Sequence, residues 1–219
     1  MRKSQTKSKQ RIADHGEVFT AEREVNAMLD LVKQETDRIE SRFLEPACGN
    51  GNFLAEILRR KLTVVRSRYS KHAADFELYS VIAVTSIYGV DILQDNVDDC
   101  RKRMFEIWDN DYTAICKKEA NDDCRESIRF ILRHNILCGN ALTLKQANDS
   151  PIIFAEWSAL NGCMMKRRDF RLDHMLEGYQ EQLTLFMTDW KYDEEIKAFI
   201  PLPIKEFPPI HYRKVQRYE

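Results

Sequence analysis

The sequence predicts an α/β fold with a mostly parallel sheet, and two patterns indicate it. Short apolar segments at 42–45, 87–91 and 135–141 are typical of strands, and segments with the apolar spacing of amphipathic helices follow the first two. The first strand also runs directly into a glycine-rich turn before its helix. Because strands that alternate with helices form parallel βαβ units, we expect ligands at the carboxyl ends of these strands.

Length and composition fit one domain with short arms. The 219 residues are 43% hydrophobic and carry a formal net charge of -1, which supports a folded core and excludes a strongly basic nucleic-acid wrapper. No apolar run approaches the roughly 18 residues that cross a bilayer, and the polar N-terminus is unlike a secretory signal. With six scattered cysteines and no zinc-type spacing, we expect a cytoplasmic protein with no metal site and no membrane partner.

The predicted elements follow one another in chain order. Helices are predicted at 22–33, 53–58, 94–108, 128–132 and 167–185. Residues 76–84 fit either a helix or a strand, a fourth strand is predicted at 151–157, and irregular segments are predicted at 59–75 and 109–126. We therefore expect a mobile basic arm at 1–14, an α/β domain at 15–198 and an extended, proline-rich tail at 199–219.

The glycine-rich turn is the sharpest feature of the sequence. In Glu45-Pro46-Ala47-Cys48-Gly49-Asn50-Gly51-Asn52-Phe53, two glycines one residue apart let the backbone come close to a ligand. The following helix offers free N–H groups, and an acid at the end of the strand suits an ammonium group. A tight turn that binds nothing is the alternative interpretation. Leu54 stands where a dinucleotide fingerprint would have its third glycine, which argues against nicotinamide cofactors.

Asp91 ends the second predicted strand. An acid there can accept both hydroxyls of a ribose, although it lies 40 residues beyond Gly51 where the usual spacing is about 20. The segment at 59–75 would account for the extra length. The alternative interpretation is an ordinary helix cap.

Four segments in order resemble a known family. E-P-A-C-G-N-G-N-F, Y-G-V-D-I and G-N-A-L, with the upstream G-E-V-F-T, resemble the motifs of S-adenosylmethionine-dependent N6-adenine DNA methyltransferases of bacterial restriction–modification systems. Their order is that of the gamma class, and the resemblance covers about residues 12–160. It implies a Rossmann-like class I methyltransferase sheet with bound S-adenosylmethionine and with DNA as a partner.

The resemblance also implies roles for individual residues. Those that would contact the methionine end of the cofactor are Phe19, Thr20, Glu45, Pro46, Ala47, Cys48, Gly49, Asn50 and Gly51. Asp91 would hold the ribose, while Ile92, Asn140 and Ala141 would contact the adenine. The family often has Asp at the position of Asn140, and an amide oxygen can also accept from the exocyclic amine.

The sequence departs from the family at the catalytic motif. The family's Asn or Asp, Pro, Pro and aromatic residue, which hold a flipped base, should follow the fourth strand, and this chain has no such tetrapeptide. Instead the strand ends in Glu156-Trp157. Either Glu156 accepts from the target amine and Trp157 stacks on the base, or the two are a solvated acid beside a core tryptophan.

The C-terminal side also departs from the family. Beyond residue 157 the sequence predicts one helix and an extended tail, so we expect a sheet that is incomplete there and is completed by a partner subunit or a second copy. Arg167 and Arg168 are candidates for contacts to DNA phosphates, with solvated surface charge as the alternative.

Three functional hypotheses remain from the sequence. The first is a component of a DNA methyltransferase, either truncated, split or divergent. The second is a non-catalytic interaction protein that docks a restriction or modification partner, and the third is a methyltransferase acting on small molecules or RNA.

Overall fold

The computed structural model describes residues 7–15, 17–177, 190–194 and 198–218. A parallel sheet lies at its centre, with strands β1 (Phe43–Glu45), β2 (Ile87–Asp91) and β3 (Ile136–Cys138) in the order β1-β2-β3. Leu44 pairs with Tyr88, and Val90 pairs with Leu137. The predicted α/β fold with a parallel sheet is therefore confirmed. As the register places the carboxyl ends of all three strands at one edge of the sheet, the loops that follow them meet there.

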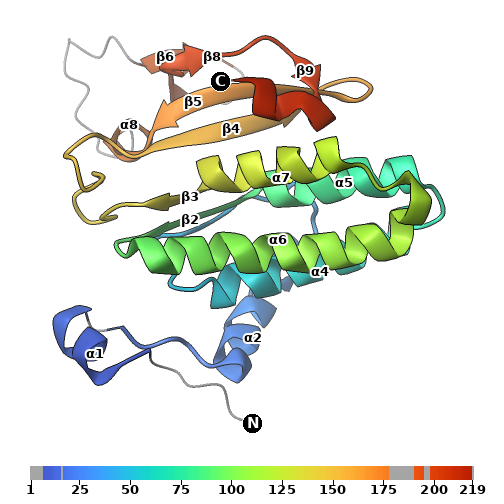
Figure 1. The fold of residues 1–219 in the computed structure, drawn as a ribbon. Coiled ribbons are helices and arrows are strands. Elements are labelled where there is room, and N and C mark those ends of the chain that lie inside the picture. Colours follow the sequence, from blue (N-terminus) through green and yellow to red (C-terminus); the bar gives the residue numbers. More distant parts are fainter. Residues whose placement is uncertain (1–6, 16, 178–189, 195–197, 219) are drawn as a thin grey trace.

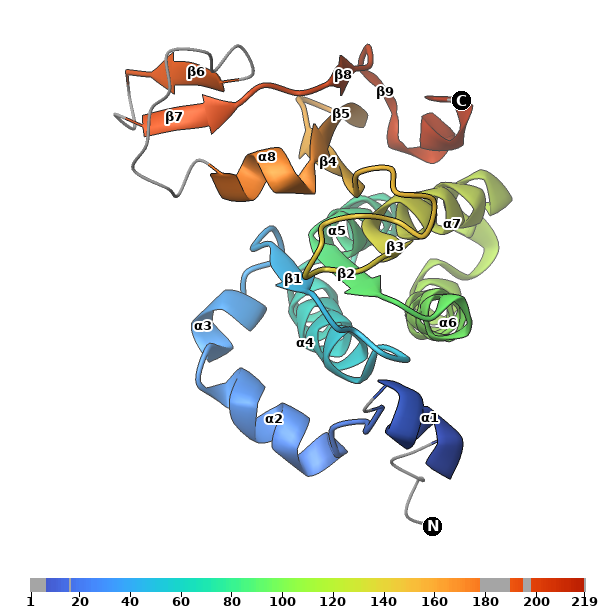
Figure 2. The ribbon, with the colours of Figure 1, turned by 90° about the vertical axis from the view of Figure 1, so that its left-hand side faces the viewer.

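Four long helices connect the strands and supply most of the core (Figure 1). They are α4 (Asn52–Tyr69), α5 (Ala73–Thr85), α6 (Gln94–Cys116) and α7 (Asp122–Asn135). Figures 1 and 2 agree that α4 and α6 lie below the parallel sheet, in these orientations, whereas a second sheet lies above it. Trp108 and Phe76, both fully buried, are among the largest side chains of this core.

Two predicted irregular segments are helical, so those predictions are wrong. Helix α4 continues through residue 69, and Leu62 and Val65 extend the buried face that begins at Leu54. Helix α6 continues through residue 116, with Tyr112 and Cys116 one and two turns beyond Trp108. In both cases charged residues on the exposed face conceal a narrow apolar stripe. Residues 76–84 belong to α5, and the short helix predicted at 128–132 is part of α7, which begins after the 3-10 turn η1 (Lys117–Glu119).

The predicted fourth strand belongs to a different sheet. Strand β4 (Ile153–Ala159) pairs antiparallel with β5 (Met164–Arg171), and β5 pairs with β8 (Lys205–Glu206) and β9 (Ile210–His211). Strand β6 (Trp190–Asp193) pairs with β7 (Ala198–Pro201). The sequence predicts no strand after residue 157, so that expectation is wrong.

The prediction of a helix at 167–185 is also wrong for the residues of that range that the structure describes. Residues 167–171 belong to β5, α8 (Leu172–Glu177) follows, and residues 178–185 lie outside the described residues. Met165, Arg167 and Asp169 alternate on the buried face of β5. Since two of these inward residues are charged, the period of two that marks a strand is hidden in the hydropathy pattern.

The N-terminal part forms three short helices. They are α1 (Lys9–His15), α2 (Glu22–Asp30) and α3 (Lys33–Thr36), so the helix predicted at 22–33 ends at Asp30. The described part of the predicted basic arm is thus largely helical. Its Arg11 forms ion pairs with Glu17 and with Asp95 of α6.

The C-terminal part is extended up to His211 and then forms the 3-10 helix η2 (Tyr212–Tyr218). The side chains of Tyr212 and Val215 are buried, and η2 packs against α7. The last described residues are therefore part of the core. None of the helices in the described residues has the length and apolar character needed to span a bilayer.

Candidate functional site

The glycine-rich loop joins β1 to α4 at the carboxyl edge of the parallel sheet. Gly49 and Gly51 have φ values of +52° and +83°, the left-handed region that favours glycine. A Cβ atom on Gly51 would lie 2.6 Å from the Sγ atom of Cys100. The Cys48 amide donates to the Val90 carbonyl at 2.9 Å, which anchors the loop to β2. The loop is thus fixed closely over β2 and α6.

Asp91 lies directly beside this loop. Its Oδ2 accepts from the Gly49 amide at 2.9 Å, and its Oδ1 accepts from the Leu93 amide at 2.9 Å and from Asn96 Nδ2 at 3.1 Å. Adjacent parallel strands bring the residues at their carboxyl ends together although they are distant in sequence. The acid and the loop that the sequence singles out therefore share one site.

The segment that resembles the leading motif of the family also reaches the loop. A Cβ on Gly49 would lie 3.1 Å from Cε1 of Phe19, so the phenyl ring covers this glycine. The Thr20 carbonyl accepts from Asn52 Nδ2 at 2.9 Å, which ties it to the first turn of α4. Phe19 and Thr20 thus lie at the site with the loop and Asp91.

The loop after β3 forms the far side of the site. The Gly139 amide donates to the Asp91 carbonyl at 2.9 Å. Ile92 is 52% exposed, which leaves an apolar side chain open to solvent beside Asp91. The Asn140 Oδ1 accepts from the Leu142 amide at 2.9 Å, so that oxygen stabilises its own turn, which also contains Ala141.

Two acceptors in or next to the glycine-rich loop suit a positively charged group. Partial burial raises the pKa of Glu45, which ends β1. The Oδ1 atom of Asn50 is buried and has no hydrogen-bond partner among the described residues. A buried unsatisfied acceptor carries a free-energy cost that a bound donor would remove. An ammonium-bearing ligand such as S-adenosylmethionine therefore fits these residues, with Pro46 and Ala47 supplying backbone of the loop.

Cys48 packs under the loop and is a poor nucleophile. Its Sγ donates to the Gly49 carbonyl at 3.7 Å, and the neighbouring Cys100 and burial raise its pKa. Within the described part of the chain, no group of three His, Cys, Asp or Glu side chains could hold a metal ion.

Glu156 and Trp157 point to opposite faces of β4. Burial raises the pKa of Glu156, but hydrogen bonds from Arg168 and Ser158 outweigh it, so the pKa lies below its usual value. This carboxylate pairs with Arg42 and with Arg168. Trp157 is buried on the other face and donates from Nε1 to Asn135 at 2.8 Å. The two side chains therefore do not face one base together in this structure.

Arg167 and Arg168 also differ in their surroundings. Arg167 is 7% exposed, pairs with Asp169 at 2.7 Å and lies over the Phe207 ring at 4.5 Å. Arg168 is partly exposed and pairs with Glu156 at 2.9 Å. Only Arg168 of this pair is open to a phosphate.

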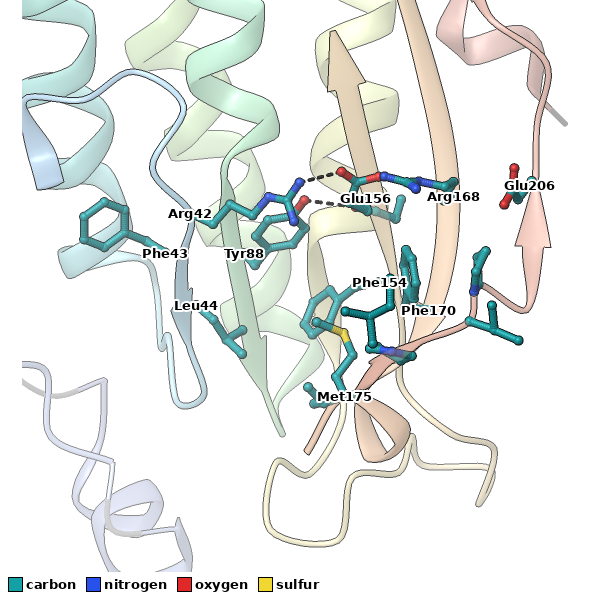
Figure 3. Close-up of a pocket in the computed structure, with 16 residues that line it drawn as sticks. Arg42, Phe43, Leu44, Tyr88, Phe154, Glu156, Arg168, Phe170, Met175 and Glu206 are labelled. Atoms are coloured by element: carbon teal, nitrogen blue, oxygen red, sulfur yellow. Dashed lines mark hydrogen bonds and ion pairs between the residues drawn. The ribbon is translucent and has the colours of Figure 1, made fainter. Parts of the chain in front are cut away.

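A cavity of about 650 Å³ lies between the outer edge of β1 and the β4–β5 sheet (Figure 3). Its lining includes Leu44, Tyr88, Phe154, Phe170 and Met175. The sequence gives no sign of this cavity, because its lining residues come from distant segments, each with the apolar pattern of ordinary core. None of the predicted cofactor residues lines it.

The comparisons with known proteins give one similarity. The chain is 24% identical over 114 residues to DNA methyltransferase A of Bacillus subtilis (strain 168), a match that covers 50% of this chain and 13% of that protein. No protein-family model and no solved structure matches the chain. The similarity supports a methyltransferase-like relationship and no finer class.

Proposed function

We propose that this chain binds S-adenosylmethionine and is related to DNA methyltransferases. The observation that carries the proposal is the meeting of three sequence-distant features at one edge of the sheet. Phe19 covers Gly49, and Asp91 accepts from the Gly49 amide. The distant similarity to a DNA methyltransferase supports the same class of cofactor. On this proposal the parallel sheet is the cofactor-binding half of a Rossmann-like class I methyltransferase fold.

Each part of the proposed site has a chemical role. The Asp91 carboxylate has four lone-pair directions and three present donors, so Oδ2 keeps one lone pair that can accept from a ribose hydroxyl. Glu45 and Asn50 accept from the ammonium group of the cofactor, and Phe19 shields its methionine end from water. Ile92 lies against the adenine, with Asn140 and Ala141 at its edge. The bound cofactor supplies an activated methyl group on a sulfonium centre.

We further propose N6 of adenine in DNA as the methyl acceptor, in a restriction–modification setting. The sequence has no Asn/Asp-Pro-Pro-aromatic tetrapeptide, and Glu156 is engaged by two arginines. We therefore infer that a partner subunit supplies the groups that hold the base. Arg168 is a candidate contact to DNA.

A methyl-transfer assay tests whether this chain needs a partner to methylate DNA. The chain would be incubated with methyl-labelled S-adenosylmethionine and DNA that lacks N6-methyladenine, and the nucleosides would be separated by mass spectrometry. We expect bound cofactor and no labelled N6-methyladenine from the chain alone. Labelled adenine would show that the chain methylates DNA by itself, whereas label on another base of the DNA would replace the proposed substrate.

A second candidate is a non-catalytic interaction protein, and the open edge of β1 favours it. Among the described strands β1 pairs only with β2, and Leu44 is 46% exposed. The Phe43 amide donates to Ser86, so the alternating Leu44 presents its N–H and C=O outward. An extended strand of a partner subunit would pair there. A chain that binds no cofactor but forms a concentration-dependent dimer, lost in Leu44→Pro, would favour this candidate with a second copy as partner.

A further inference from the structure

Asn96 connects Asp91 of the proposed cofactor site to the N-terminal segment. It lies in the first turn of α6 and is 1% exposed. Its Nδ2 donates to Asp91 Oδ1 at 3.1 Å and to Glu17 Oε1 at 2.7 Å. Its Oδ1 accepts from Arg11 Nη2 at 3.2 Å. The side-chain amide therefore contacts the acid of the site and the N-terminal segment at once.

The orientation of this amide is determined by its neighbours. Both N–H bonds point to carboxylates, and the oxygen faces a guanidinium. Turning the amide by 180° would place its oxygen against both carboxylates and its nitrogen against the cation. Asn96 thus has one favourable arrangement, and in that arrangement it fixes Asp91 Oδ1.

The N-terminal partners are themselves held by ion pairs. Arg11 donates from Nε and Nη2 to the two Glu17 oxygens, each at 2.7 Å, and its Nη1 donates to Asp95 at 2.6 Å. Hydrogen bonds from Arg11 oppose partial burial and lower the pKa of Glu17, so this carboxylate is ionised. Glu17 lies two residues before Phe19, whose ring covers Gly49. One network therefore joins the N-terminal segment, α6 and the glycine-rich loop.

We propose that Asn96 is a positioning residue for Asp91 and that Arg11 and Glu17 hold Asn96 in place. This inference rests on the proposed cofactor site and adds residues that lie outside its contact surface. The hydrogen bond from Asn96 to Oδ1 orients the Asp91 carboxylate, so that the one free lone pair, on Oδ2, is directed at the ribose. Seating of the N-terminal segment and binding of the ribose are therefore coupled through one amide.

Asn96→Asp tests the proposal because it keeps the shape of the side chain and removes both donors. It also places a carboxylate against those of Asp91 and Glu17, so like-charge repulsion adds to the loss of the donors. The matched control is Gln94→Ala in the same turn, whose amide donates to Asp98 of the same helix. We expect Asn96→Asp to raise the Kd for S-adenosylmethionine about 10-fold or more, because it removes a hydrogen bond to a charged group. Gln94→Ala should leave the Kd unchanged.

A double-mutant cycle separates positioning from general loosening. If Asn96 acts through Asp91, Asn96→Asp should change the Kd by less than about 3-fold in an Asp91→Asn background. An effect of the same size in both backgrounds would overturn the proposed coupling. Arg11→Ala, which removes a guanidinium on a side chain that is 24% exposed, provides a second variant outside the core. It should raise the Kd several-fold, and an unchanged Kd would remove Arg11 and Glu17 from the network.

Hydrogen exchange of the Gly49 amide provides a readout that needs no cofactor. This amide donates to Asp91 Oδ2, so loss of the Asn96 contact should speed its exchange, while Gln94→Ala should not. If the wild type binds S-adenosylmethionine and Asn96→Asp changes neither the Kd nor the exchange rate of the Gly49 amide, the role of Asn96 is refuted and the proposed function stands. No binding by the wild type would refute the proposed function, and the inference that rests on it.

Discussion

Lys61 is a charged residue in the core directly below β1. Its side chain is fully buried, and Nζ donates to the carbonyls of Ile39 and Ser41 and to the hydroxyl of Ser86. The ammonium also lies 5.2 Å from the centre of the Phe43 ring. These contacts tie the segment before β1 to α4 and to the start of β2. Burial lowers the pKa of Lys61 from 10.5 to about 7.

This lowered pKa makes stability depend on pH. Between pH 7 and 10.5 the unfolded chain holds a proton on Lys61 that the folded chain has lost, so the free energy of unfolding rises with pH. The expected slope is about 1.4 kcal/mol per pH unit at most for one proton. Lys61→Met should remove this slope.

Urea unfolding of both proteins from pH 7 to pH 9.5 measures the difference. Because other groups titrate in the wild type and in the variant alike, their effects cancel in the comparison. Parallel curves for the two proteins would mean that Lys61 stays protonated in the fold.

The glycine-rich loop illustrates a constraint at the scale of an element. Gly51 and Gly162 both have a left-handed φ, +83° and +74°. A Cβ on Gly51 would collide with Cys100, whereas a Cβ on Gly162 would meet nothing within 4 Å. A comparison of substitutions at these two glycines therefore separates the energetic cost of a left-handed φ from the cost of a steric clash.

We expect Gly162→Ala to lower the free energy of unfolding by about 1–2 kcal/mol, the cost of a left-handed alanine. Gly51→Ala should cost about 1–3 kcal/mol more, because the loop or α6 must move. Adding Cys100→Ala to Gly51→Ala should recover part of that excess. If denaturant titrations give the same loss in free energy of unfolding for Gly51→Ala and Gly162→Ala, the glycine-rich loop accommodates the added Cβ at no extra cost.

The elements also show which parts of the fold are readable from the sequence. The three parallel strands are apolar segments ended by turns, and the acid and glycines at their ends follow from the strand positions. Strand β5 is not readable, because its buried Arg167 and Asp169 compensate each other only in the folded chain. The same holds for Asn96, since an asparagine gives no sign of its partners until α6 and the N-terminal segment are in place.

At the scale of the whole molecule, the C-terminal segment closes the core. Glu77 on α5 is buried and accepts hydrogen bonds from Tyr112, Tyr212 and Arg213. Two of these donors belong to η2. The hydroxyl of Tyr218, at the end of η2, lies 2.8 Å from the carbonyls of both Met165 and Pro208 and shares its one hydrogen between them. Helix η2 is thus hydrogen-bonded to α5 and to the antiparallel sheet.

Two tyrosine substitutions in η2 test how much these hydrogen bonds contribute to the free energy of unfolding. Tyr212→Phe removes a donor to a carboxylate and should cost about 1.5–3 kcal/mol, whereas Tyr218→Phe removes a donor to neutral carbonyls and should cost about 1 kcal/mol. Thermal and denaturant unfolding measure both. If Tyr212→Phe proves no more destabilising than Tyr218→Phe, Glu77 is not the main anchor of η2.

The arrangement of the two sheets places the candidate cofactor site and the open edge of β1 in different parts of the molecule. Among the described strands β1 forms one edge of the parallel sheet, and the antiparallel sheet occupies the space above it in the view of Figure 2. The cofactor residues and the cavity lie at different places on the molecule. A partner could therefore use the open side of β1 without displacing the residues around Asp91.

Calorimetric titration of S-adenosylmethionine into the chain tests the central claim most directly. Asp91→Ala serves as the test variant, and Asp98→Ala as the control, since Asp98 is an exposed acid paired with Arg101. We predict a Kd in the micromolar range for the wild type and for Asp98→Ala, and a Kd at least about 10-fold higher for Asp91→Ala. No heat at millimolar cofactor, or equal binding by Asp91→Ala, would contradict the account.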